Sequence, residues 1–233
     1  MKKMLGVLGG LGSEASAVFY KKIVDNTLAL NDQDHLNILI YNHADIPDRT
    51  EYITSGRDIE LFEILNQDLK KLSDFGCEVL CIACNTSHYF IKDLQKNSKS
   101  EIVDMIFEAV KAVKEKSPNV KKIGIMGTTG TVKYEIYKNA CEHFNIEPIY
   151  PDDEFQQTTM DIIYKQIKSG KKGSLEDFMK VSYNLKEKGA EKIILSCTEL
   201  SVFAQENNLS DYYTDALDVL TKKVIILCGG KLV

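Results

Sequence analysis

The chain has 233 residues, of which 44% are hydrophobic and 27% are charged, a composition typical of a soluble globular protein with one large or two small α/β domains. This composition disfavours disorder and a purely fibrous role. The net charge of -5 offers no basic surface for nucleic acid or an anionic membrane, and no apolar run approaches the roughly 20 residues that cross a bilayer.

The start of the chain and its cysteines bear on the compartment. The segment from Met1 to Leu8 has a signal-like charge pattern, but its apolar stretch is short and Gly-rich, so we interpret it as the first strand. Six cysteines without framework spacing, several of them inside apolar runs, indicate reduced thiols. We therefore expect a cytoplasmic protein.

The first half of the chain alternates strand and helix patterns. The predicted elements are a strand at 3–8, a helix from Ser13 or Glu14, a strand at 37–42, a helix at 58–75 closed by Gly76, a strand leading to Cys84, a helix at about 87–94, a short apolar segment at 102–105 and a helix at 106–116. Pro47 forces the loop 43–50 off the sheet edge. The segment 117–119 is the clearest linker.

The second half repeats this alternation. The predicted elements are a strand at 123–126, a helix at 132–144, a strand at 146–150, helices at about 154–168 and 174–188, a strand leading to Cys197, and a last helix at 217–227. Such alternation predicts parallel sheets covered by helices. We expect two pseudo-symmetric, three-layer α/β domains, the first formed by 1–117 plus 210–233 and the second by 118–209.

The two halves also share details of sequence. Cys84 and Cys197 each lie eight positions after a glycine and just before a threonine-bearing segment. Each first strand runs into a Gly-x-x-Gly turn, at 9–12 and at 127–130. Because ligands of parallel α/β sheets bind beyond the carboxyl ends of the strands, we expect the active site in a cleft between the two domains.

Two cysteines at equivalent strand ends suit the inversion of a carbon centre. One thiolate removes a proton from one face and the opposed thiol returns a proton to the other face, with no cofactor. For the other four cysteines (Cys77, Cys81, Cys141 and Cys228), the simpler interpretation as small buried hydrophobic residues is favoured.

Rival interpretations come from two short motifs. Cys81-x-x-Cys84 would place its sulfurs on opposite faces of a strand, and no second Cys/His pair has metal-ligand spacing, so we expect no metal. Gly10-x-Gly12-x-x-Ala15 matches the dinucleotide fingerprint. However, the second strand ends at Tyr41-Asn42, without the acidic residue that would bind the ribose.

Several polar residues have two possible roles. Arg49 and Lys168 are either solvated charges or cations that bind a carboxylate. His88 either tunes a thiol or caps a helix, and Glu199 either influences proton movement or forms a structural pair. The residues alone leave these alternatives open.

Five motifs in order resemble the aspartate/glutamate racemase family, most closely its aspartate racemase branch, over nearly the whole chain. They are Gly9-Gly10-Leu11-Gly12, Ile46-Pro47-Asp48-Arg49-Thr50, Cys84-Asn85-Thr86-Ser87-His88, Thr128-Thr129-Gly130-Thr131 and Cys197-Thr198-Glu199. The chain departs from the family pattern at Leu11, Ser13, Ser16 and Asp215-Ala216.

The resemblance implies a pyridoxal-independent racemase, usually dimeric, with Cys84 and Cys197 as its two bases. It also implies the residues that bind the substrate. Those for the α-carboxylate and amino group are Asn85, Thr86, Thr128, Thr129, Thr131 and Thr198. Arg49 and Lys168 would bind the side-chain carboxylate, and Leu11 would lie near the pocket mouth. We expect interconversion of L- and D-aspartate by a homodimer with no cofactor. A glutamate or broad-specificity racemase, an NAD-dependent oxidoreductase and a non-catalytic amino-acid-binding module are the alternatives.

Overall fold

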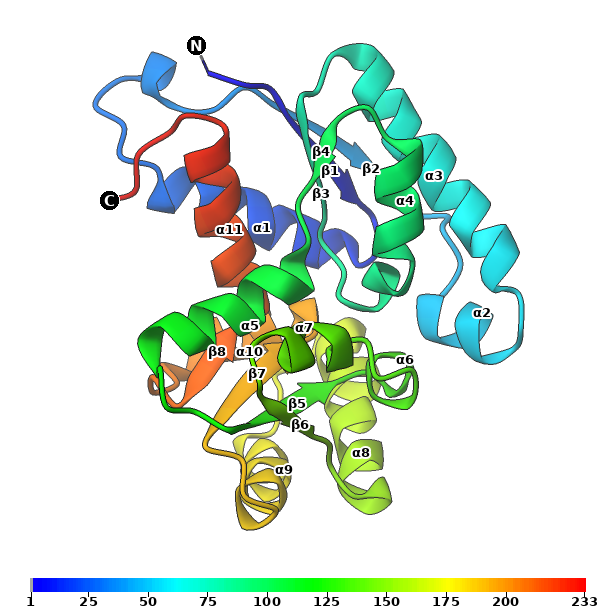
Figure 1. Ribbon diagram of the computed structural model, residues 1–233, viewed down its shortest axis with the longest axis vertical. Helices are drawn as coiled ribbons and strands as arrows, with labels where there is room; N and C mark the ends of the chain where they lie inside the picture. Colours follow the sequence, from blue (N-terminus) through cyan, green and yellow to red (C-terminus); the bar gives the residue numbers. More distant parts are fainter. Residues whose placement is uncertain (1) are drawn as a thin grey trace. The chain divides into compact units, whose positions relative to one another are not determined.

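The computed structural model describes residues 2–233, which form two compact units (Figure 1). One unit contains the chain up to Met105 together with Leu217–Val233, and the other contains Ile106–Ala216. The second unit therefore begins twelve residues before the expected position 118 and ends seven residues after the expected position 209. The later end has a clear cause, since residues 213–215 form a strand that pairs within the second sheet.

The sheet of the first unit is fully parallel and has the strand order β2-β1-β3-β4. Its strands are β1 (Leu5–Gly9), β2 (Ile38–Asn42), β3 (Val79–Ile82) and β4 (Glu101–Ile102). Every residue of β1 and β3 is buried, as expected for central strands covered on both faces. Gly6 is required in β1, because a Cβ there would lie 2.6 Å from the Leu80 side chain.

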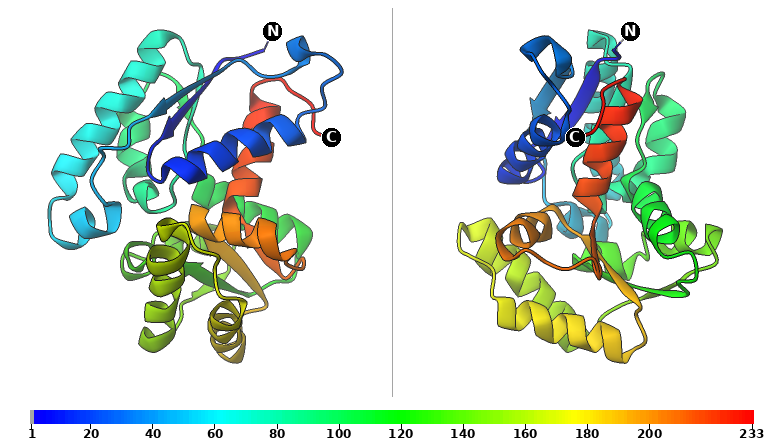
Figure 2. Two further views of the ribbon diagram at one scale, coloured as in Figure 1. Left: turned by 180° about the vertical axis from the view of Figure 1, so that it is seen from behind. Right: turned by 90° about the vertical axis from the view of Figure 1, so that its left-hand side faces the viewer.

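The helices of the first unit cover both faces of its sheet. They are α1 (Ser13–Asn26), η1 (Asp32–Asp34), α2 (Arg49–Thr54), α3 (Asp58–Phe75), η2 (Thr86–Phe90), α4 (Ile91–Asn97) and α11 (Ala216–Leu227). Helices α3 and α4 lie on one side, and α1 and α11 on the other (Figure 2). The predicted stripe of α3 is confirmed, since Leu61, Leu65, Leu69 and Leu72 are buried and Gly76 ends the helix in a left-handed conformation.

The second unit repeats this plan with the strand order β6-β5-β7-β8, again fully parallel. Its strands are β5 (Lys122–Gly127), β6 (Glu147–Ile149), β7 (Lys192–Ser196) and β8 (Tyr213–Asp215). Its core is a cluster of buried aliphatic and aromatic side chains that includes Ile193, Leu195, Phe178 and Phe203, whose two rings stack at 4.6 Å.

Its helices differ from the prediction in two places, since the helix at 198–207 was not predicted and the helix predicted at 132–144 is divided in two. They are α5 (Met105–Lys116), α6 (Thr129–Lys133), α7 (Lys138–His143), α8 (Asp153–Met160), the π-helical turn η3 (Asp161–Gln166), the 3-10 turn η4 (Ile167–Ser169), α9 (Leu175–Glu187) and α10 (Thr198–Asn207). The single helix predicted at 132–144 was wrong, because Glu135 adopts a left-handed conformation (φ 46°) that separates α6 from α7. None of the helices formed by residues 2–233 combines the length and apolar composition needed to cross a bilayer.

Candidate functional site

The two candidate catalytic cysteines occupy the same position in their respective sheets. Cys84 follows β3 and Cys197 follows β7. Each of these strands neighbours the first strand of its own sheet, which ends in the Gly-rich turn. In both sheets, successive strands are added first on one side of the first strand and then on its other side, where the cysteine-bearing connection begins. The boundary between these two sides is a topological switch point, and open α/β sheets bind ligands at such points.

Cys84 lies in a buried segment. Its side chain is 7% exposed, and the following residues Asn85 and Thr86 are also buried at the start of η2. His88 closes this segment: its Nδ1 lies 2.8 Å from the Cys84 carbonyl, and its Nε2 accepts the Met105 N–H at 3.2 Å. Because Nε2 is an acceptor, Nδ1 carries the proton and donates it to that carbonyl. Of the two roles left open for His88, this geometry favours the structural one.

Arg49 is buried at the start of α2, and its guanidinium is bound by backbone carbonyls. It donates to Leu11 O at 2.6 Å and to Pro47 O at 3.1 Å, with a longer contact to Ile46 O at 3.4 Å. The structure thus brings together two of the predicted site residues, Arg49 and Leu11. Arg49 is therefore not a solvated charge, and it fixes the Gly-rich turn through the Leu11 carbonyl.

The Gly9–Gly12 turn packs against its own unit. The Gly10 N–H donates to Ser16 Oγ at 3.0 Å, and Ser16 Oγ donates to Gly12 O. A Cβ on Gly9 would lie 2.6 Å from Ser16 Oγ, and one on Gly10 would lie 2.4 Å from the backbone of His43. Gly9 and Gly10 are thus explained by close internal contacts, which weakens the argument that Gly10 serves a dinucleotide pyrophosphate.

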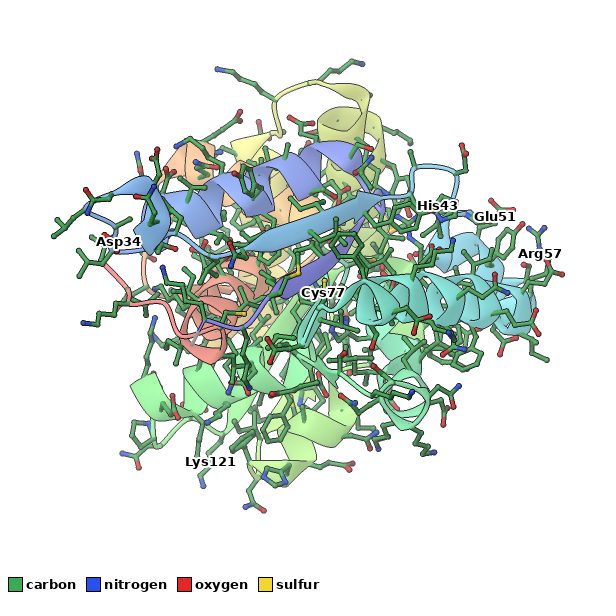
Figure 3. The ribbon with its side chains drawn as sticks, turned by 90° about the horizontal axis from the view of Figure 1, so that it is seen from above. Asp34, His43, Glu51, Arg57, Cys77 and Lys121 are labelled. Atoms are coloured by element: carbon green, nitrogen blue, oxygen red, sulfur yellow. The ribbon has the colours of Figure 1, made fainter. Side chains whose placement is uncertain are left out.

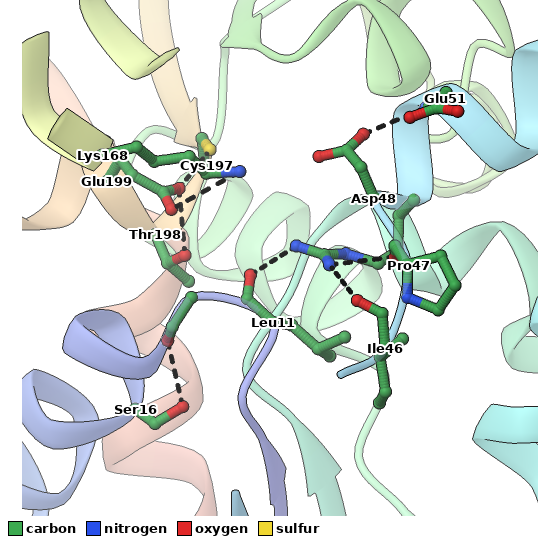
Figure 4. Close-up of polar contacts among 12 residues, drawn as sticks. Leu11, Ser16, Ile46, Pro47, Asp48, Glu51, Lys168, Cys197, Thr198 and Glu199 are labelled. Carbon is green, nitrogen blue, oxygen red and sulfur yellow. Dashed lines mark hydrogen bonds and ion pairs between the residues drawn. The ribbon is translucent and has the colours of Figure 1, made fainter. Parts of the chain in front are cut away.

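Cys197 and Glu199 are buried in the second unit, and the partly exposed Lys168 lies beside Glu199 (Figure 4). The Cys197 thiol donates to Glu199 Oε2 at 2.9 Å, and Lys168 Nζ lies 3.9 Å from Glu199 Oε1. The Thr198 hydroxyl also donates to Glu199 Oε2, at 3.3 Å. Burial and the Glu199 charge raise the pKa of the Cys197 thiol well above its ordinary value, and they outweigh the positive charge of Lys168.

The position of Lys168 depends on an irregular helix. Helix α8 continues into the π-helical turn η3 and then into η4, where Lys168 lies. Its ammonium also lies 4.1 Å from the centre of the Tyr164 ring. A π-helical segment changes the direction of the side chains that follow it, and such segments are frequent at functional sites.

The threonine turn after β5 is buried and capped. Thr128 is the N-cap of α6: its hydroxyl oxygen accepts the Thr131 N–H at 3.3 Å and lies 3.2 Å from the Thr131 hydroxyl. Thr129 is half-buried, and its N–H points at the Met160 sulfur. Gly127 has no room for a side chain, because a Cβ would lie 2.2 Å from Ser196 Oγ.

The sequence interpretation missed Gln156 at this turn. This buried α8 residue donates from Nε2 to Gly127 O at 3.0 Å. Its Oε1 is buried and has no hydrogen-bond partner within the described chain. No local pattern identifies it, since it lies 29 residues from the carbonyl it binds.

The remaining cysteines are buried, as expected for structural residues. Cys77, Cys81, Cys141 and Cys228 are at most 2% exposed, and burial raises the pKa of each thiol. Across residues 2–233, no group of three or more His, Cys, Asp or Glu side chains is arranged to hold a metal ion.

Comparison with known proteins gives the family. The family model described as Asp/Glu/Hydantoin racemase matches residues 8–223. The broad specificity amino-acid racemase RacX of Bacillus subtilis is 23% identical over 207 residues, which are 85% of this chain and 86% of RacX. An uncharacterized protein from the pnlA 3' region of Pectobacterium carotovorum is 33% identical over 138 residues, 58% of this chain and 91% of that protein.

A solved structure supports the same assignment. The Picrophilus torridus aspartate racemase has a TM-score of 0.81 and 26% identity, covering 99% of this chain and 96% of that one. The match of the family model to residues 8–223, together with these similarities, places the chain in the Asp/Glu/hydantoin racemase family as an amino-acid racemase.

Proposed function

We propose that the chain interconverts L- and D-aspartate by a two-base mechanism in which Cys84 and Cys197 act on opposite faces of the substrate Cα, without a cofactor. The observation that carries the proposal is the equivalent placement of the two cysteines. Each lies after the end of the strand that is across the switch point from a Gly-rich turn. Of the four further cysteines, Cys81 lies inside β3 and not after its end, and the other three lie outside β3 and β7. The mechanism requires that one bound amino acid be reached by both sulfurs.

In this mechanism the thiolate of one cysteine removes the α-proton and the other thiol donates its proton to the opposite face. The resulting carbanion needs electrostatic stabilisation, since no pyridoxal delocalises its charge. We assign this role to hydrogen-bond donors around the α-carboxylate from Asn85, Thr86, Thr128, Thr129, Thr131 and Thr198. Each well-placed donor contributes about 3 kcal/mol, by analogy with oxyanion holes.

Glu199 is the group to which Cys197 can lose its proton. The raised pKa of Cys197 keeps its thiol protonated at neutral pH, so a thiolate forms only when a nearby group accepts the proton. Glu199 Oε2 is 2.9 Å from the sulfur and accepts its hydrogen bond. We infer that the proton passes from Cys197 to Glu199, which leaves a thiolate and a neutral carboxylic acid.

Arg49 and Lys168 are the cations we assign to the side-chain carboxylate of aspartate. Both have protein partners, since Arg49 binds backbone carbonyls and Lys168 lies near Glu199. The side-chain carboxylate of a bound substrate must therefore either add to these contacts or displace them. This competition keeps glutamate and broader substrate ranges as alternatives, and the name of RacX agrees with a broad range.

The deciding experiment is α-proton exchange in D2O. L-aspartate and L-glutamate are incubated separately with the chain, without added cofactor, and followed by NMR and chiral chromatography. With L-aspartate, we expect deuterium at Cα and D-aspartate to appear together. With L-glutamate, we expect deuterium exchange and formation of D-glutamate to be slower. Absence of exchange with either amino acid contradicts the proposal, and a titration with NADH then tests the oxidoreductase alternative.

Cysteine variants test the two-base assignment. Cys84→Ser and Cys197→Ser should each lower the racemisation rate by at least about 100-fold, because each removes one proton carrier. Cys141→Ala, at a buried cysteine away from both strand ends, is the matched control and should keep the rate. Full racemisation by either serine variant rules out two cysteine bases.

The assembly and compartment are part of the same proposal. We propose a homodimer, as the family resemblance implies, which light scattering during size-exclusion chromatography measures directly. All six cysteines are free, which supports a reducing compartment such as the cytoplasm.

A further inference from the structure

Asp68 is a buried carboxylate that the proposed reaction does not use. It lies on the buried side of α3 among leucines and is 1% exposed. Its Oδ2 is 2.6 Å from His43 Nδ1, and its Oδ1 is 2.8 Å from Lys71 Nζ. A carboxylate in such a position costs stability unless it is paired, and an aliphatic side chain would pack there at no such cost. Its pairing with His43 therefore indicates a positioning role.

His43 follows β2 and lies beside α3 (Figure 3). Its ring stacks on Tyr41 at 5.4 Å, and Lys71 lies over the Tyr41 ring at 5.1 Å. The imidazole is thus hydrogen-bonded to the Asp68 carboxylate at Nδ1 and packed against the face of the Tyr41 ring. The ring is oriented by α3 and β2 together.

The backbone of His43 is part of the Gly-rich turn. Its N–H donates to Gly9 O at 3.3 Å, and its carbonyl oxygen lies within 2.4 Å of where a Gly10 Cβ would stand. The Ile46 N–H in turn donates to His43 O at 3.4 Å. A shift of His43 would therefore move both the turn and the start of the loop that follows.

The far end of the same loop is Arg49, which binds Leu11 O at 2.6 Å. The segment 43–49 is thus attached to the Gly9–Leu11 turn at both ends, by the His43 backbone and by the Arg49 guanidinium. The first of these attachments is anchored to α3 through the contact between His43 and Asp68.

We propose that the Asp68–His43 pair is a positioning element that fixes the segment 43–49, and with it Arg49 and Leu11, for substrate binding. This inference rests on the proposed function, in which these two residues lie at the substrate. The pair touches no reacting atom in that mechanism, so its loss should weaken substrate binding more than turnover.

The test is a set of four variants assayed for racemisation of L-aspartate. His43→Leu removes the hydrogen bond to Asp68 and should raise KM about tenfold while kcat changes less than about twofold. His43→Asn keeps a donor at the position of Nδ1 and should restore KM to within about threefold of wild type. Asp74→Asn, in an exposed pair with Lys70 on the same helix, is the control and should change neither constant.

The fourth variant separates positioning from stability. His43→Leu combined with Asp68→Leu leaves no unpaired buried charge, so its free energy of unfolding should recover. We expect KM to stay raised, because the attachment to α3 is still missing. A KM that recovers in this double variant, or a wild-type KM in His43→Leu, overturns the proposal.

Hydrogen exchange provides a readout that does not need activity. The amides of residue 43 and Ile46, which donate to Gly9 O and to the carbonyl of residue 43, should exchange faster in His43→Leu than in wild type or in Asp74→Asn. If the wild-type chain racemises no amino acid, the proposed function fails and this measurement alone decides the positioning role. Unchanged exchange at both amides overturns it.

Discussion

The Cys197 thiol donates a hydrogen bond to the Glu199 carboxylate at 2.9 Å, and both side chains are buried at the start of α10. Desolvation and the neighbouring negative charge both favour the protonated thiol, whereas Lys168 favours the thiolate. The arrangement therefore stores a proton on sulfur next to a group that can accept it. A cysteine that must alternate between donor and acceptor needs such a neighbour.

Replacing Glu199 by glutamine tests this relationship. Glu199→Gln keeps the size of the side chain and removes the proton acceptor, so the racemisation rate at neutral pH should fall about 100-fold. Loss of the negative charge should also lower the pKa of Cys197, so activity should rise more steeply with pH than in wild type. Steady-state rates across a pH series measure both effects.

Thiol alkylation is the control for Glu199→Gln. The pH at which Cys197 becomes reactive should move down in the variant, whereas Cys141, which has no contact with Glu199, should react as in wild type. A wild-type rate and an unshifted Cys197 profile in Glu199→Gln would show that the contact is only structural.

Arg49 and Arg57 provide a matched pair for the second prediction. Arg49 is buried and donates to three backbone carbonyls, whereas Arg57 is partly exposed and pairs with Glu51 at 2.8 Å. A lysine ammonium cannot reproduce the several N–H donors of the planar guanidinium. In Arg49→Lys the free energy of unfolding should therefore fall by about 2 kcal/mol, and KM should rise. Arg57→Lys should change stability by less than about 0.5 kcal/mol. Urea unfolding compares the two variants, and equal losses would contradict the assigned role of Arg49.

His88 gives the third prediction. His88→Phe keeps the ring but leaves the Cys84 carbonyl and the Met105 N–H without their partner, so stability should fall by about 2–5 kcal/mol. His88→Asn keeps one donor and should lose about half as much. The pH profile of kcat in His88→Asn should match that of wild type, because His88 carries no proton in the reaction.

The exposed His143 is the control for His88. It contacts only the rings of Phe107 and Phe144 among the interactions described, so His143→Phe should change stability little. If His88→Asn instead keeps wild-type stability and loses an ionisation from the kcat profile, His88 is an acid or base rather than a structural residue.

Much of this architecture could be predicted from residue patterns. Buried apolar runs define the strands, and the glycine and cysteine spacing shows that the two halves share a plan, which the identical strand orders confirm. The break at Glu135 could not be predicted, since no glycine or proline marks it. The pattern of 132–144 suits a helix locally, and tertiary packing of the fully buried Tyr137 accompanies the break.

The hydrogen-bond partners of the polar residues could not be predicted from the sequence either. Arg49 binds backbone carbonyls, which every residue possesses, so no residue type identifies them. His43 and Asp68 are separated by 25 positions, and Asp68 lies in a helix whose other buried residues are leucines. Such contacts are fixed by the folded geometry of β2 against α3 and not by local spacing.

The last prediction concerns stability at alkaline pH, through Cys141. This thiol is fully buried, and burial, with a smaller effect of the Glu142 charge, raises its pKa to about 12. In the unfolded chain a thiol has a pKa of about 8.5. The unfolded state therefore loses this proton first as the pH rises, so the contribution of Cys141 to stability is complete below about pH 8 and is lost between about pH 8.5 and 12.

Cys141→Val has a similar volume and no proton to lose. Between pH 7.5 and pH 10, wild type should lose about 2 kcal/mol more unfolding free energy than Cys141→Val, as measured by urea unfolding at both pH values. Other titrating groups are common to both proteins and cancel in this difference. Ala140→Gly, at the neighbouring buried position, lacks any ionising change and should lower stability equally at the two pH values. Parallel losses in wild type and Cys141→Val would show that the thiol ionises as readily in the folded state as in the unfolded one.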